Sequence, residues 1–225
     1  MHQWNIYHDF KQASQHAADF LARHIDNYIN NNGVCHVILP GGNTPIECLK
    51  LLSEKTLSWE KVHWYLGDER CLSPGDSERN DLMLENNLWS KINKANVHRI
   101  AAELGAEEAA AQYRNEIKDI NSFDIAFLGM GEDGHTASLF PGHEALNDTR
   151  SVIPVYHSPK PPSDRVSLSL DTLSKTKTKV VLVGGSAKKQ ILKRIKDNEP
   201  FPINSIGDIN WFIDEASHTS ETSLL

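Results

Sequence analysis

Asp133 and His135 lie on either side of a single glycine, in a turn that follows the apolar segment FDIAF. An imidazole of ordinary pKa, about 6.5, can act as a base near neutral pH, and a nearby carboxylate can tune it. The surrounding stretch, LGMGEDGHTASLFPGH at residues 128–143, contains four glycines, which let a ligand approach the backbone. We therefore predict a catalytic pair here, with a helix cap or a surface histidine as the alternative.

Metal and thiol chemistry have less support in this sequence. His135 and His143 lack the CxxC or HExxH partners of zinc sites, so no metal is expected and His143 is predicted to be structural. Free thiols in a reducing cytoplasm are the simplest interpretation of the three cysteines, which have no CxxC spacing: Cys35, Cys48 and Cys71. A catalytic Cys71 beside Arg70 stays open as a minor alternative.

A second glycine-rich turn follows the apolar run VCHVIL. It holds Gly41 and Gly42, then Asn43 or Thr44 as a possible helix cap, and then Pro45, which suits a first helical turn. The open N–H groups of a helix N-terminus bind anions such as phosphate. LPGGNTP is neither a P-loop nor GxGxxG, so a nucleotide site is not implied, and an ordinary tight turn is the alternative.

Charged side chains follow other apolar runs. Asp68, Glu69 and Arg70 come directly after VHWYLG, where a buried carboxylate pair is costly unless it is used. Arg165 begins RVSLSL, and Lys188 follows the glycine pair of LVGG. Each cation alone is most simply a solvated charge. Together, however, Arg70, Arg165 and Lys188 can form one phosphate pocket, since an arginine fork matches phosphate geometry.

Alternating helices and strands must position these side chains. Helices are predicted at residues 10–29, 46–53, 81–92, 105–117 and 186–197, with a polar loop at 67–80. Strands are predicted at residues 34–40, 62–66, 96–100, 123–128, 151–157, 165–170, 179–185 and 209–213. This alternation predicts a three-layer, Rossmann-like α/β fold, in which a mainly parallel sheet is flanked by helices. Ligands bind such sheets beyond the carboxyl ends of their strands.

Length and composition restrict the remaining possibilities. The 225 residues, 39% of them hydrophobic, are expected to form a single domain over 1–225, with a frayed tail from about residue 216. A net charge of −7 argues against nucleic-acid binding. No secretory signal and no membrane span are visible, so we expect a cytoplasmic protein that is a monomer or weak homo-oligomer.

Six segments occur in an order typical of one family: LPGGNTP, GDERC, SERND, LGMGEDGHTASLFPG, RVSLSL and GGSAKK. Over about residues 34–192 the chain resembles the 6-phosphogluconolactonases, which are related in fold to the glucosamine-6-phosphate deaminases. The resemblance implies hydrolysis of 6-phosphoglucono-δ-lactone to 6-phosphogluconate in the oxidative pentose phosphate pathway. It also implies that no metal or organic cofactor takes part, and that the partner is a small sugar-phosphate lactone.

The resemblance also assigns roles to residues. His135 corresponds to the catalytic histidine of the family, and Asp133 is expected to orient it. Arg70 and Lys188 correspond to phosphate-site residues, and Arg165 matches a phosphate-binding arginine of the deaminases. The remaining predicted substrate contacts are Gly41, Gly42, Asn43, Thr44 and Asp68. Asn43 stands where serine is common in the family, and the loop CLSPGDSERN also departs from the usual pattern.

Two other functions stay in view. The motif of the deaminases continues to a glutamate that assists ring opening, and the matching position here is Phe140, which cannot carry protons. This residue favours lactone hydrolysis. A non-catalytic sugar-phosphate-binding module is the second alternative, although such a module would not need both Asp133 and His135. The oxyanion site is left open between the amides of Gly41–Gly42 and those of 131–134.

Overall fold

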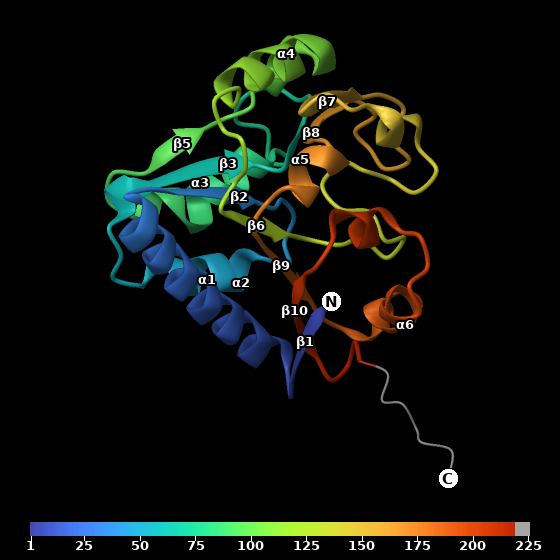
Figure 1. Cartoon of the computed structure of the whole chain (residues 1–225). Helices are drawn as coiled ribbons and strands as arrows, with labels where there is room; N and C mark the ends of the chain where they lie inside the picture. The colour runs from blue at the N-terminus through green and yellow to red at the C-terminus, as the bar shows by residue number, and fades with distance from the viewer. Residues whose placement is uncertain (219–225) are drawn as a thin grey trace.

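A seven-stranded sheet forms the centre of the computed structural model, in which residues 1–218 are described (Figure 1). All neighbouring strands in it run parallel. In spatial order they are β1 (Gln3–Tyr7), β10 (Asn210–Asp214), β9 (Thr178–Val183), β6 (Ile125–Leu128), β2 (Cys35–Leu39), β3 (Val62–Leu66) and β5 (Asn96–His98). The central strands are short apolar runs that are buried almost throughout, as parallel strands covered on both faces must be.

Helices cover both faces of this sheet. The helices are α1 (Phe10–Asn32), α2 (Ile46–Ser53), α3 (Asn80–Asn87), α4 (Ala106–Glu116), α5 (Leu170–Ser174) and α6 (Lys189–Lys196). Figure 1 shows α1 and α2 on one side of the sheet and α4 on the other. Asp9 caps the first turn of α1, and Gly33 ends it in the left-handed conformation that glycine adopts at no steric cost. The predicted three-layer α/β fold is confirmed.

A second, smaller sheet departs from the expected arrangement. It is antiparallel and consists of β4 (Asp68–Arg70), β8 (Arg165–Leu168) and β7 (Val152–Val155). The strands predicted at 151–157 and 165–170 therefore exist, but they lie outside the parallel sheet. The prediction of a polar loop at 67–80 was wrong at its start. β4 is too short and too polar to be recognised as a strand from its own residues, without its partner β8. This pairing places Arg70 directly opposite Arg165.

Other boundaries also differ from expectation. β1 is not among the predicted strands, and within residues 1–218 it pairs with β10 alone. The helix predicted to end at residue 92 ends at Asn87 and is followed by a 3₁₀ turn. The chain is ordered past residue 216, since Ser217 is buried and its N–H donates to Asp214 Oδ1 at 2.9 Å. Residues 219–225 of the predicted frayed tail lie outside the described residues. Within the described part, no helix is both long and apolar enough to cross a membrane.

Candidate active site

A cavity of about 190 Å³ lies at the carboxyl ends of β2, β3 and β6, where the small sheet meets the large one. Its wall consists mainly of the turns after these strands: Pro40, Gly41, Gly42, Thr44, Gly67, Asp68, Arg70, Asn80, Leu128, Gly129, Met130, Gly131, His135, Ala137 and Arg165. Seven of the predicted site residues are in this wall. Three are not: Asn43, Asp133 and Lys188.

His135 and Asp133 are in direct contact. His135 Nδ1 lies 2.5 Å from Asp133 Oδ1, which also accepts the backbone N–H of His135 at 3.3 Å. Burial lowers the pKa of His135, and the bond to Asp133 only partly opposes this effect. Burial raises the pKa of Asp133, but its two bonds with His135, together with the charges of His135 and Lys160, outweigh burial and leave that pKa lowered. An ionised Asp133 can only accept a hydrogen bond, so Nδ1 of neutral His135 carries the proton and donates it to this bond. The lone pair of the imidazole is therefore on Nε2.

The turn around His135 depends on its glycines. A Cβ on Gly131 would lie 2.0 Å from His135 Nδ1, so no other residue fits there without displacing the imidazole. Gly134 has a φ of +79°, a conformation that other residues rarely adopt. The N–H of Gly131 donates to the carbonyl of His135 at 2.9 Å, and that of Gly134 donates to the carbonyl of Gly131 at 3.0 Å. These two amides are therefore used inside the turn.

The other glycine-rich turn has open amides. Among residues 1–218, the backbone N–H groups of Gly41 and Gly42 have no hydrogen-bond partner, and both residues line the cavity. A Cβ on Gly41 would lie 2.0 Å from Asn80 Oδ1, so this backbone packs tightly against the start of α3. An anion in the cavity can therefore be bound by these amides.

Asp68 joins three parts of the cavity wall. Its Oδ2 accepts a hydrogen bond from Ser138 Oγ at 2.6 Å, and its Oδ1 accepts one from Asn80 Nδ2 at 3.2 Å. Asp68 is only 8% exposed, so both bonds offset the cost of burying its charge. Neither Asn80 nor Ser138 is among the residues predicted to form the site. The motif SERND, part of the family resemblance, was the available signal for Asn80.

Glu69 supports the site from behind. It is fully buried, and its carboxylate accepts the backbone N–H groups of Arg70, Asn80 and Asp81, each at 2.8 Å. Burial raises its pKa to about 7, against the opposing effect of these bonds. Two of the donors are in the first turn of α3, where a carboxylate is favourable. Of the acidic pair in GDERC, Asp68 therefore faces the cavity and Glu69 fastens β4 to α3.

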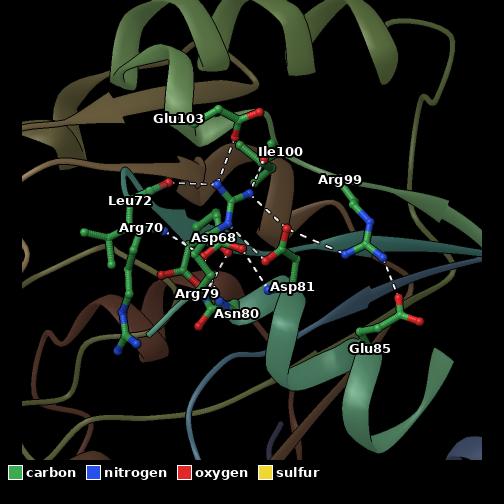
Figure 2. Close-up of polar contacts among 11 residues, drawn as sticks. Asp68, Arg70, Leu72, Arg79, Asn80, Asp81, Glu85, Arg99, Ile100 and Glu103 are labelled. Carbon is green, nitrogen blue, oxygen red and sulfur yellow. Dashed lines mark hydrogen bonds and ion pairs between the residues drawn. The ribbon is translucent and has the colours of Figure 1, made fainter. Parts of the chain in front are cut away.

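Arg79, which sequence reasoning missed, holds the loop after β4. Its guanidinium forms a two-pronged bond with Asp81 at 3.0 and 2.9 Å and a bond with Glu103 at 2.9 Å (Figure 2). It also donates to the carbonyls of Leu72 and Ile100. The side chain is 3% exposed. Arg79 is therefore a structural residue, whose donors are all directed at the protein.

The predicted cations are arranged differently. Figure 2 shows the Arg70 side chain pointing away from the Arg79 network. Arg70 Nη1 donates to the carbonyl of Glu78 at 2.5 Å, but its buried Nε has no partner. Lys188 Nζ donates to the carbonyl of Met130 at 2.8 Å and so reaches the cavity wall from outside. Within the described residues, neither Arg70, Lys188 nor Arg165 forms an ion pair. This positive charge is well placed to bind an anion.

Three further residues limit the possible chemistry. Phe140 is buried with its ring centroid 4.6 Å from that of His135, so an apolar ring occupies the place beside the imidazole. His143 Nε2 lies 2.8 Å from the carbonyl of Tyr156, and its Nδ1 accepts the N–H of Ala145, which is a structural role. Burial raises the pKa of Cys71 to about 11, which argues against a thiolate nucleophile. Among residues 1–218, no cluster of three or more acidic, histidine or cysteine side chains could hold a metal ion.

Comparisons with known proteins identify the family of this chain. The family described as glucosamine-6-phosphate isomerases/6-phosphogluconolactonase matches residues 8–211. A 6-phosphogluconolactonase of Haemophilus influenzae is 31% identical over 91% of this chain and 95% of the relative. The human 6-phosphogluconolactonase is 36% identical over 69% of this chain and 67% of the relative. A crystal structure of 6-phosphogluconolactonase from Thermotoga maritima superposes with a TM-score of 0.89 at 27% identity, covering 96% of this chain and all of the other. The chain belongs to the glucosamine-6-phosphate isomerase/6-phosphogluconolactonase family.

Proposed function

We propose that this protein hydrolyses 6-phosphoglucono-δ-lactone to 6-phosphogluconate in the oxidative pentose phosphate pathway. The observation that carries the proposal is the His135–Asp133 pair beside a cavity whose cations have no ion-pair partner in residues 1–218. A base next to an anion-binding cavity suits a substrate with a phosphate at one end and a reactive ester at the other.

In the proposed mechanism, Nε2 of neutral His135 takes a proton from water. The resulting hydroxide attacks C1 of the lactone, and a tetrahedral oxyanion forms. The bond from C1 to the ring oxygen then breaks, and imidazolium His135 returns the proton to that oxygen. Asp133 holds the imidazole by Nδ1 and stabilises its charged form, as the carboxylate does in hydrolytic triads. Each step uses only water and groups of the protein.

Binding and charge stabilisation are assigned to separate groups. The amides of Gly41 and Gly42 are the better candidates for the oxyanion, because those of Gly131 and Gly134 already have partners within the turn. Arg70 and Lys188 are assigned to the phosphate. An anchored phosphate holds C1 at a constant distance from His135, which lowers the entropic cost of reaching the transition state.

The proposal is tested by generating the lactone in solution and following the release of acid. We expect His135→Ala to reduce kcat by about a hundredfold or more, the usual contribution of a general base. An unchanged rate in this variant would refute the assignment of the base. Release of ammonia from glucosamine 6-phosphate would instead identify a deaminase, for which Phe140 supplies no proton carrier. Competitive phosphate binding without turnover of either substrate would identify a binding module.

A further inference from the structure

The loop at residues 157–164, HSPKPPSD, connects β7 to β8 and has a well-defined shape. The N–H of Ser158 donates to the carbonyl of Ser163 at 3.0 Å, which closes the loop. Ser158 Oγ donates to the carbonyl of Lys160 at 2.8 Å and accepts the N–H of Lys160 at 3.3 Å. The backbone of Lys160 is therefore held in one position, while its side chain is exposed.

Arg165 fastens this loop to the cavity. Its Nη2 donates to the carbonyls of Lys160 at 3.1 Å and Pro161 at 3.0 Å, and its Nε donates to that of Pro162 at 3.2 Å. Arg165 also lines the cavity, and its guanidinium carbon lies 5.6 Å from the centre of the Phe140 ring, which packs against His135. Arg165 thus directs two of its three nitrogens at the loop.

Lys160 lies beside the cavity wall, because its carbonyl accepts a hydrogen bond from Arg165, which lines the cavity. Its side chain makes no hydrogen bond or ion pair with any residue among 1–218. Burial is the main cause that lowers the pKa of Lys188. The positive charge of Lys160 also lowers it, whereas the charges of Glu132 and Asp133 raise it. The charge of Lys160 acts in the same direction on the pKa of His135. The Lys160 charge therefore acts on both Lys188 and His135, from a loop that Arg165 holds against the cavity wall.

We infer that Lys160 contacts the phosphate of a sugar-phosphate substrate together with Lys188, and that Arg165 acts chiefly as the positioning residue of the Lys160 loop. The inference rests on the proposed function, since it names a further residue of that site. The two ammonium groups repel each other, and an anion bound between them offsets this repulsion. A phosphate monoester dianion carries enough charge to pair with both lysines. The fixed backbone and long side chain of Lys160 let the ammonium group reach over the cavity edge while its loop stays in place.

The test compares Lys160→Met with the matched control Lys193→Met, which removes the same charge from an exposed position on α6. Losing one charged contact to phosphate predicts that KM for the phosphorylated lactone rises about tenfold to a hundredfold, with kcat nearly unchanged. Inhibition by inorganic phosphate weakens in parallel. Turnover of glucono-δ-lactone, which has no phosphate, stays the same. Lys160→Arg restores most of the affinity.

The role of Arg165 is tested by a double-mutant cycle. If Arg165 acts through the loop, Arg165→Met combined with Lys160→Met raises KM little more than Arg165→Met alone. Additive effects would show that Arg165 contacts phosphate independently. An unchanged KM and unchanged phosphate inhibition in Lys160→Met would overturn the inference. If the wild type fails to hydrolyse the lactone, the proposed function fails, but calorimetric binding of 6-phosphogluconate to wild type and Lys160→Met still tests Lys160.

Discussion

Arg79 and Arg70 lie within the same short stretch of chain but in opposite environments. Arg79 has two carboxylates and two carbonyls around its guanidinium. Burial lowers its pKa, but the bonds to Asp81 and Glu103 outweigh burial and leave the pKa raised. Arg70 has a buried Nε without a partner and no ion pair in the described chain. A satisfied arginine holds a fold together, whereas an unsatisfied one next to a cavity is available to a ligand.

The comparison predicts opposite consequences for the same substitution. Arg79→Met leaves Asp81 and Glu103 without their main partner in a buried network, which costs about 3–5 kcal/mol of unfolding free energy. Urea denaturation measures this loss, and Arg70→Met is the matched control, expected to change stability by less than about 1 kcal/mol. Equal losses in the two variants would remove the distinction between the two arginines.

For substrate binding, we expect Arg70→Met to have a large effect, in contrast to its small effect on stability. Arg70→Met removes a charged contact to phosphate and should raise KM for the phosphorylated lactone by about tenfold to a hundredfold, or about 1.4–2.8 kcal/mol. Steady-state kinetics with the lactone generated in solution provide the measurement. If KM stays at the wild-type value while glucono-δ-lactone is also turned over normally, Arg70 does not bind the phosphate.

Inorganic phosphate should stabilise the folded protein by binding in the cavity. At about ten times its dissociation constant, a ligand that binds only the folded state raises the unfolding free energy by about 1.4 kcal/mol. We expect this gain in the wild type, measured as a higher denaturation midpoint than in a buffer that contains neither phosphate nor sulfate. Arg70→Met should show little of it at the same phosphate concentration. A gain of equal size in both proteins would mean that phosphate acts elsewhere.

The smallest expected effect concerns pH. Because burial lowers the pKa of His135, the neutral base persists to a pH below its ordinary value of about 6.5. The value of kcat/KM should therefore fall only as pH decreases through that lowered pKa, about tenfold per unit at the steepest part. Arg70→Met should leave the midpoint of this acid limb in place. A large shift of the midpoint would mean that Arg70 acts on His135 rather than on phosphate.

The contrast between the two arginines also explains where sequence reasoning ended. Long apolar strands and the glycine-rich turns after them were predictable, because strand burial and turn geometry follow from local residue types. Asp68 to Arg70 form a strand only because β8 lies beside them, and no local pattern contains that partner. The structural role of Arg79 could not be predicted for the same reason. Two of its partners, Glu103 and the carbonyl of Ile100, come from a later part of the chain.

The site residues divide in the same way. The positions of His135 and Gly41 at strand ends could be read from the sequence. The contact of Asp133 with His135, the occupied amides of Gly131 and Gly134, and the turning of Arg165 toward its own loop depend on side-chain and backbone geometry.

The pairing of β1 with β10 has a consequence for how the main sheet is completed. Among the described residues, β1 precedes every other strand, and β10, with which it pairs, follows all the others. β1 cannot bond within the sheet until β10 is in place, and contacts this distant in sequence slow folding. We expect partly folded chains to have β1 unpaired and the edge of β10 exposed, which makes that stage of folding the one most susceptible to aggregation.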